Sequence, residues 1–328
     1  MSDIMNRTTV SIGLDIGGTN AKIGLVSRNG NILRSATEPM PHNKSAEHLM
    51  QKLTMRIQSL INWGMKKNYE LMGMGVSVCG IVNTDGDKPD YINIHALDHY
   101  PLRAHFETEF NIPVVLESDM NCAALGEYYF GDRKGTTRLM VTTIATGIGM
   151  GMIVAGKLVR TNFGTTGNPG HIIVDPTGPI CIAGCRGCLE SLCSSSAMSH
   201  LAEAVALSQR DTLLSALLAE KKRLTPKDVF IAAEAGDKYA QMLWGDVGRW
   251  MGRALATWAG IFGPEVIIVG GGMANAGHWL IDPMEREMRN CGEPYFIRQV
   301  KEVAQSSLGV NIAMLGAASM VHCQRDYR

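Results

Sequence analysis

A strand, a glycine turn and a second strand occur twice in this chain, and this repeat limits the possible folds more than any other feature. The first copy has strands over 9–14 and 21–27 on either side of Gly17 and Gly18. The second has a strand over 138–145, the turn Gly147-Ile148-Gly149-Met150-Gly151 and a short meander that follows it, about 130 residues later. The repeat indicates an internal duplication, with one phosphate-binding unit in each of two α/β domains. A coincidental likeness of two glycine-rich hairpins is the alternative.

The first glycine turn carries groups that suit a phosphate with its magnesium ion. Gly17 and Gly18 lack a Cβ, so an oxyanion can approach the N–H groups of the turn closely. Thr19 adds a hydroxyl donor, and Asp15 adds a carboxylate that can hold a hydrated metal ion. An ordinary hairpin turn, with Asn and Gly in forced dihedral angles, is the alternative interpretation.

A third glycine cluster, Gly270-Gly271-Gly272, follows an apolar strand over 264–269 and precedes a predicted helix over 276–289. Because a strand–glycine–helix junction at the carboxyl edge of a sheet is a usual nucleotide site, this cluster is a candidate nucleotide site. The last helix, predicted over 312–323, is expected to fold back and link the two domains.

The charge balance and the hydropathy pattern exclude several classes of protein. Lys plus Arg and Asp plus Glu both number 31, so the chain lacks the basic excess of a general nucleic-acid binder. No run of 18 apolar residues is present, and the start has no signal-peptide pattern. We therefore expect a cytoplasmic protein with no nucleic-acid or membrane partner, in which the eight cysteines stay reduced.

Three of those cysteines and one histidine crowd together. His171, Cys181, Cys185 and Cys188 supply one imidazole and three thiols within 18 residues, a set that suits tetrahedral zinc in a structural site. The Cys-x2-Cys spacing of the last two is common among zinc ligands. Cys193 is a spare candidate, and three free thiols without zinc are the alternative.

Further motifs lie between these features, and together they form an ordered series along residues 9–320. The series comprises Asp15-Ile16-Gly17-Gly18-Thr19-Asn20, residues 117–127, residues 145–151, Gly170-His171, residues 181–190 and residues 269–272. In this order they resemble the ROK family, which groups sugar kinases and sugar-responsive repressors within the actin-like ATPase superfamily.

The resemblance implies a two-domain α/β architecture, the actin-like ATPase (ribonuclease H-like) fold, with an interdomain cleft. The N-terminal domain is expected over 1–117, with a C-terminal helix at 312–328 packing back on it. The second domain is expected over 118–311, with the zinc loop and a helical subdomain. The family also suggests a homodimer.

The same resemblance implies an ATP-dependent sugar kinase that phosphorylates a hexose or N-acylhexosamine, with the 6-hydroxyl as the expected acceptor. Asp119 matches the catalytic base and is expected to stay ionised at a helix start, although it could merely cap the helix over 121–130. Magnesium and the ATP phosphates would contact Asp15, Gly17, Gly18, Thr19, Asn20, Thr146, Gly147, Gly270, Gly271 and Gly272. The sugar would contact Gly80, Asn93 in a polar loop over 83–99, Ser118, Asp119, Asn168, His171 and Glu190. The alternative for Glu190 is a carboxylate in a first helical turn.

Departures from the family pattern gather on the sugar side. Ser118 stands where the family has Asn, Asn168 where it has Glu, and Cys79 where it has Pro. An amide in place of a carboxylate removes a charged acceptor, so we expect a sugar other than plain glucose. The zinc pattern departs as well, because Ala183 replaces a family cysteine and Cys185 is the candidate replacement ligand.

Two other functions fit parts of the pattern. A sugar-responsive regulator would need a helix-turn-helix before the first phosphate strand, and we expect no room for one before residue 9. A catalytically silent sugar-binding protein is suggested by Ser118 and Asn168. Sugar binding without ATP turnover would distinguish it from a kinase.

Overall fold

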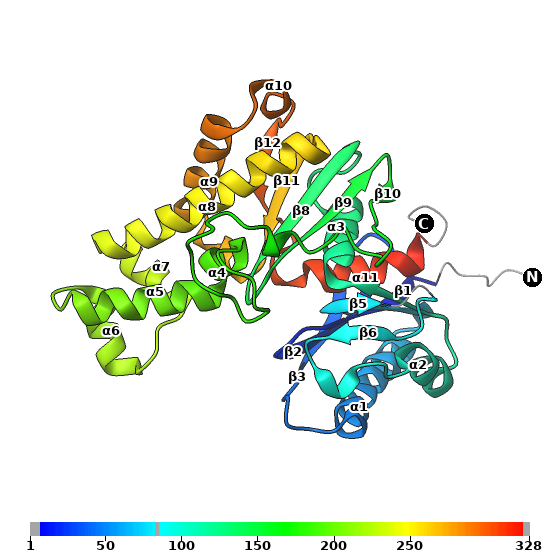
Figure 1. The fold of residues 1–328 in the computed structure, drawn as a ribbon. Coiled ribbons are helices and arrows are strands. Elements are labelled where there is room, and N and C mark those ends of the chain that lie inside the picture. The colour runs from blue at the N-terminus through cyan, green and yellow to red at the C-terminus, as the bar shows by residue number, and fades with distance from the viewer. Residues whose placement is uncertain (1–6, 83–84, 324–328) are drawn as a thin grey trace, which may run out of the picture. The chain divides into compact units, whose positions relative to one another are not determined.

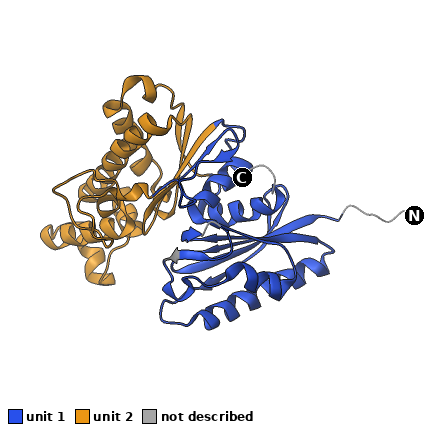
Figure 2. Ribbon diagram, turned by 45° about the vertical axis from the view of Figure 1, so that its right-hand side comes forward, with its two compact units in different colours: residues 1–137, 151–167, 307–328 blue, residues 138–150, 168–306 orange. Residues whose placement is uncertain are grey.

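The computed structural model describes residues 7–82 and 85–323, which form two compact units that both mix helices and strands (Figures 1 and 2). Unit 1 combines residues 1–137, 151–167 and 307–328, and unit 2 combines residues 138–150 and 168–306. The predicted α/β class is confirmed. Residues 324–328, which the sequence analysis included in the last helix, lie outside the described residues.

The first sheet has the strand order β3-β2-β1-β4-β7. Its strands are β1 (Thr9–Ile16), β2 (Asn20–Ser27), β3 (Ile32–Pro39), β4 (Glu70–Val78) and β7 (Val114–Ser118). Strands β1, β2 and β3 form an antiparallel meander, as the glycine turn predicts, whereas β1, β4 and β7 run parallel. The carboxyl ends of three parallel strands therefore lie along one edge of this sheet.

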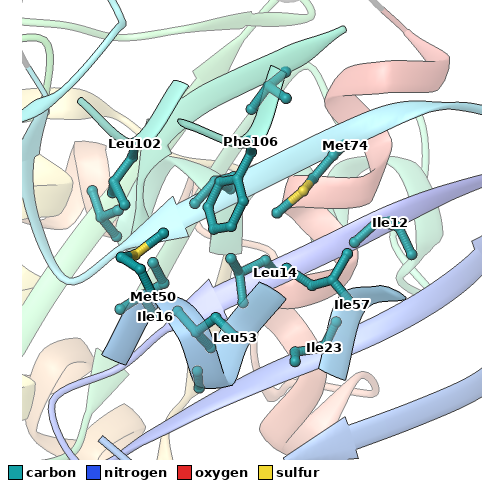
Figure 3. Packing of buried hydrophobic residues seen from close by; sticks show 14 of the residues in the cluster. Ile12, Leu14, Ile16, Ile23, Met50, Leu53, Ile57, Met74, Leu102 and Phe106 are labelled. Carbon is teal, nitrogen blue, oxygen red and sulfur yellow. The ribbon is translucent and has the colours of Figure 1, made fainter. Parts of the chain in front are cut away.

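One face of this sheet holds the hydrophobic core of unit 1. Side chains alternate between the two faces of a strand, so Ile12, Leu14 and Ile16 of β1 share the core face (Figure 3). Helices α1 (Ala46–Lys66) and α2 (Leu102–Phe110) cover that face with residues such as Leu53 and Phe106, both fully buried. Along α1, apolar residues recur at helical spacing and Ser45 caps the first turn by accepting from the His48 N–H.

The opposite face of the same strands is lined by small residues and covered by helix α11 (Ile312–His322). A Cβ at Gly75 would lie 1.8 Å from the carbonyl oxygen of Ala317, and one at Gly13 would lie 2.2 Å from that of Met314. Glycine is required at both positions because the helix backbone sits directly on the sheet.

Helix α3 (Asp119–Phe130) packs equally closely on α11. A Cβ at Gly126 would lie 2.4 Å from the Ile312 oxygen, and one at Gly316 would lie 1.7 Å from the Cys122 oxygen. This close packing explains why α3 falls in unit 1. The boundary expected from sequence, after residue 117, would instead assign α3 to the second domain.

The second sheet has the order β10-β9-β8-β11-β12, which repeats the order of the first. Its strands are β8 (Arg138–Ile144), β9 (Ile148–Val154), β10 (Lys157–Leu158), β11 (Val266–Gly270) and β12 (Glu302–Gln305). Strands β9 and β10 are antiparallel, and β11 runs parallel to both β8 and β12. The shared order of the two sheets agrees with the predicted duplication.

The rest of unit 2 is mostly helical. Its helices are α4 (Leu189–Cys193), α5 (Ser195–Ser208), α6 (Leu213–Lys221), α7 (Pro226–Glu234), α8 (Lys238–Phe262), α9 (His278–Cys291) and α10 (Pro294–Ile297). The longest, α8, packs along α9 (Figure 1). Among the described residues, none of these helices or those of unit 1 has the length and apolar character needed to cross a lipid bilayer.

The segment 83–99 is not the open loop that the sequence analysis expects. Strand β6 (Pro89–Ile92) pairs antiparallel with β5 (Gly80–Val82), and a 3-10 helix follows at His95–Leu97. Residues 83–84 lie outside the described residues. This hairpin places Asn93 beside the end of β4, because the Asn93 N–H donates to the Cys79 oxygen at 3.2 Å.

Candidate active site

Polar side chains gather where the parallel strands of unit 1 end. In the sheet register Asp15 of β1 lies opposite Ser77 of β4, and Ser77 lies opposite Glu117 of β7. These residues alternate with the core-facing residues, so all three belong to the face that α11 and α3 cover. The sheet thereby brings together carboxylates from two motifs that are far apart in the sequence.

Asp15 is a buried carboxylate with two polar partners. The Ser77 hydroxyl donates to its Oδ1 at 2.9 Å, and the ammonium of Lys22 lies 3.9 Å from its Oδ2. Burial raises the pKa of Asp15, while the charge of Lys22 and the hydrogen bond from Ser77 act in the opposite direction. Lys22 was missed in the sequence analysis, although its place opposite Asp15 in the β1–β2 hairpin follows from the turn length.

The first glycine turn connects β1 to β2 and is closed by the Gly17 N–H, which donates to the Asn20 oxygen at 3.2 Å. Neither Gly17 nor Gly18 has a positive φ. The turn joins two antiparallel strands, so an ordinary hairpin turn stays the alternative interpretation. The nearest atom to a Cβ at Gly18 would be the Asn93 Cβ at 3.9 Å. Thr19 and Asn20 are exposed, so the turn leaves room and donors for an anion.

Asp119 is the first residue of α3, directly after the end of β7. Its Oδ1 accepts from the Met120 N–H at 2.9 Å. Burial, followed by the nearby charge of Asp15, raises the pKa of Asp119 to about 7, although hydrogen bonds from Cys79 and Met120 lower it. The helix start was expected to keep this carboxylate ionised, whereas a pKa of about 7 leaves only part of it ionised near neutral pH, because burial outweighs the helix dipole.

Cys79 and Asn93 stand next to this carboxylate. The Asn93 Nδ2 donates to the Cys79 Sγ at 3.1 Å, and the thiol also hydrogen-bonds to Asp119. Gly80 follows at the start of β5 and is half-buried. Four of the residues assigned to sugar binding, Gly80, Asn93, Ser118 and Asp119, thus lie at or near one edge of one sheet.

Ser118 and Asn121 each bury a polar atom without a hydrogen-bond partner in the described part of the chain, the Ser118 Oγ and the Asn121 Oδ1. Beneath them Glu117 accepts from the Ser118 N–H at 2.8 Å and from the Asn121 Nδ2 at 2.9 Å. Arg160 completes this cluster at 2.6 Å from the Glu117 Oε2. The pair was missed because Arg160 lies in a loop with no motif, 43 positions after its partner in the chain.

In unit 2 the second glycine turn connects β8 to β9 and is contacted by Glu190. The Ile148 N–H donates to the Glu190 Oε2 at 3.0 Å, and a Cβ at Gly147 would lie 2.7 Å from the same oxygen. Thr146 at the turn is exposed. Glu190 lies in the first turn of α4, as its alternative interpretation states, but its carboxylate points at the turn and at His171, whose Nε2 is 3.8 Å from the Glu190 Oε1.

The predicted zinc ligands come together beside Glu190. One ligand atom from each of His171, Cys181, Cys185 and Cys188 lies within 4.8 Å of every other. The His171 Nδ1 is 3.2 Å from the Cys185 Sγ, which is 3.1 Å from the Cys181 Sγ. A tetrahedral Zn–S site needs sulfur atoms about 3.8 Å apart, so the four donors fit zinc after a small expansion.

The remaining cysteine of this region lies elsewhere. Cys193 is buried and donates to the Val247 oxygen at 3.7 Å, outside the cluster. Within the cluster, burial works against ionisation of Cys181, but hydrogen bonds from the Cys185 thiol and from backbone N–H groups lower its pKa to about 6. The Cys185 replacement is thus compatible with the donor geometry, and the spare candidate Cys193 is not part of it.

The third glycine cluster joins β11 to the 3-10 helix Gly272–Ala276. Gly271 has a φ of +86°, and a Cβ there would lie 2.4 Å from the Ile144 oxygen at the end of β8. Gly272 has open space where a Cβ would stand. Gly271 therefore adopts the positive φ that the turn needs, whereas Gly272 leaves its backbone accessible. Asn168, at the entry to the 3-10 helix Pro169–His171, is also exposed.

Known proteins resemble the chain over nearly its whole length. A glucokinase of Thermotoga maritima is 32% identical over 313 residues, which cover 94% of this chain and 96% of that protein. A glucokinase of Streptomyces coelicolor is 32% identical, with 95% and 97% covered. The crystal structure of a ROK family glucokinase from Streptomyces griseus, in complex with glucose and AMPPNP, matches with a TM-score of 0.82 and 31% identity, over 95% of this chain and 98% of that one.

The family model described as ROK family matches residues 11–324. The motifs on which the resemblance was based all fall inside this match. The fold of the solved relatives is the predicted actin-like ATPase fold. With a match of this extent, this chain belongs to the ROK family.

Proposed function

We propose that this chain transfers the γ-phosphoryl group of ATP to the 6-hydroxyl of a hexose or N-acylhexosamine, with Asp119 as the general base. Relatives at 32% identity that are named glucokinase support ATP-dependent sugar phosphorylation. The observation that carries the role of Asp119 is its place at the carboxyl edge of the sheet with a pKa of about 7. A base with a pKa near the working pH is well matched to accept a hydroxyl proton.

The first glycine turn and its surroundings supply the groups for the phosphates. The Asp15 carboxylate would hold a hydrated magnesium ion, and the exposed Thr19 hydroxyl, with Gly17, Gly18 and Asn20, would donate to phosphate oxygens. When bound, magnesium supplies neutralisation of the charge that builds up on the phosphate oxygens. The Lys22 Nζ lies 3.9 Å from the Asp15 Oδ2, and its positive charge stabilises the buried carboxylate. In unit 2 we assign the same phosphate-binding role to Thr146, Gly147 and Gly270–Gly272.

The sugar specificity would follow from the polar groups that we assign to sugar binding in each unit. We assign sugar contacts to Gly80, Asn93, Ser118, Asn168, His171 and Glu190. The Ser118 Oγ is buried and has no hydrogen-bond partner in the described structure, so it has capacity for a ligand hydroxyl. Because Ser118 and Asn168 differ from the family pattern, we expect a less common aldohexose, an N-acylated amino sugar or a modified sugar rather than plain glucose.

A panel of hexoses and N-acetylhexosamines in an ADP-release assay with magnesium tests this function. We expect turnover with at least one sugar, and Asp119→Asn should abolish it while ATP still binds. Isothermal titration that shows sugar binding with no ATP turnover by the wild-type protein would instead indicate a silent binding protein. Analysis of the product by NMR identifies the phosphorylated hydroxyl. The homodimer and the cytoplasmic location stay predictions.

We also propose a structural zinc ion held by His171, Cys181, Cys185 and Cys188. All four positions would be protein ligands, so the ion would fix the loop that carries His171 and Glu190 rather than perform chemistry. Metal analysis of the purified protein should find about one zinc per chain. Cys185→Ser should lose it and Cys193→Ser should retain it. A protein that contains no zinc, or a Cys185→Ser variant that keeps it, contradicts the assignment.

A further inference from the structure

Cys79 occupies the point where β4 passes into β5, and its backbone is fixed on both sides. Its N–H donates to the Ile16 oxygen at 3.2 Å, and its carbonyl oxygen accepts from the Asn93 N–H at 3.2 Å. The first contact ties Cys79 to the end of β1, and the second ties it to the chain after β6. These two hydrogen bonds therefore fix the backbone position from which the Cys79 side chain projects.

The Cys79 thiol has a polar partner on each of two sides. Asn93 donates its Nδ2–H to the Sγ at 3.1 Å, and the thiol hydrogen-bonds to the Asp119 carboxylate. A thiol carries one hydrogen, and an ionised carboxylate can only accept. When Asp119 is ionised, the S–H therefore points to its carboxylate, and the sulfur lone pairs accept from Asn93.

The thiol keeps its proton in this arrangement. Burial, the charge of Asp119 and the charge of Asp15 together raise the pKa of Cys79 far above its ordinary value. The sulfur is thus a neutral donor to the carboxylate whenever Asp119 is ionised. A proline, which the resemblance to the ROK family implies at this position, has no side-chain donor and could not make this contact.

We propose that Cys79 is a positioning residue that holds the Asp119 carboxylate in orientation and couples it to Asn93. The inference rests on the proposed function, in which Asp119 is the base and Asn93 a sugar contact. The Met120 N–H and the Cys79 S–H are two donors that restrict rotation of the carboxylate. The same thiol fixes the Asn93 amide, so the base and the sugar contact are oriented together.

The test compares Cys79→Ala, Cys79→Ser and the control Cys291→Ala, which changes an exposed cysteine near the end of α9. The measurement is kcat and kcat/KM for the best sugar between pH 5.5 and 9. We expect Cys79→Ala to lower kcat about tenfold and to raise KM for the sugar. Its acidic limb in kcat/KM should move upward by about half a pH unit or more, since the carboxylate loses a donor. Cys79→Ser, which retains an O–H donor, should restore most of the kcat and the acidic limb.

Two results would overturn the inference. One is a Cys79→Ala enzyme whose kcat and acidic limb match those of the wild type and of Cys291→Ala. The other is a folded Cys79→Ser enzyme as impaired as Cys79→Ala, which would mean that size and not hydrogen bonding matters. Circular dichroism confirms folding, and the serine variant keeps the test decisive if the alanine variant unfolds. If Asp119→Asn retains activity the proposed function fails, whereas an inactive Asp119→Asn with an unchanged Cys79→Ala profile refutes only the role of Cys79.

Discussion

Replacing Asp119 by asparagine should make the protein more stable at pH 8 while it removes catalysis. In the unfolded chain this carboxyl group loses its proton near pH 3.8, but in the folded chain it does so near 7. Between these pH values the folded state binds more protons than the unfolded state, so the group's effect on stability becomes less favourable as pH rises through the window. Asparagine has a similar shape and no charge, so it avoids the desolvation.

The size of the effect follows from the shift in pKa. The difference between a pKa of about 7 in the folded chain and 3.8 in the unfolded chain corresponds to about 4 kcal/mol. The Asp119 side chain is half-buried, and residual hydration offsets part of this free energy, so we expect a gain of about 2 kcal/mol at pH 8. At pH 5 the Asp119 carboxyl group of the folded wild type is already protonated. Less than half of the stability gain from Asp119→Asn should therefore remain at that pH.

Urea unfolding at pH 5 and at pH 8 measures both values, with Asp132→Asn as the control. Asp132 is an exposed residue just after α3, so its replacement should change the free energy of unfolding by less than about 0.5 kcal/mol at either pH. A gain that is absent at pH 8, or equal at the two pH values, would refute the reasoning from burial. Activity in the ADP-release assay is a separate readout, and an active Asp119→Asn enzyme would remove Asp119 from the mechanism.

Two further predictions concern the frame around the site. Gly75→Ala would place a carbon 1.8 Å from the Ala317 oxygen, so it should lower the free energy of unfolding by about 3 kcal/mol. Gly260→Ala in α8 has open space and should raise it by roughly 0.5–1 kcal/mol, and equal urea midpoints for the two variants would contradict the close packing of α11. Arg160→Met leaves the buried Glu117 charge unpaired and should lower the same free energy by about 2 kcal/mol, while the double variant with Glu117→Gln should recover most of the loss. A double variant no more stable than Arg160→Met would show that the charge pair is not the cause.

The local sequence was sufficient for the parts of this protein that depend on short-range geometry. Two glycines between apolar runs predicted the β1–β2 hairpin, because the alternation of side chains and the turn length set strand and register together. The spacing of one histidine and three cysteines over 171–188 predicted a cluster whose ligand atoms the loop does bring together. The ordered motifs were also specific enough to predict the family.

Tertiary structure decided the properties that depend on contacts between distant segments. From sequence, Asp119 was expected to be ionised by the helix start, but burial and the charge of Asp15, more than 100 positions away, raise its pKa to about 7. Likewise, no sequence motif predicted a role for Arg160, whose guanidinium lies 2.6 Å from the Glu117 carboxylate in the folded chain. Local pattern fixes which groups are present and how each strand turns. The ionisation and orientation of those groups are set by burial and by neighbours that only the folded chain supplies.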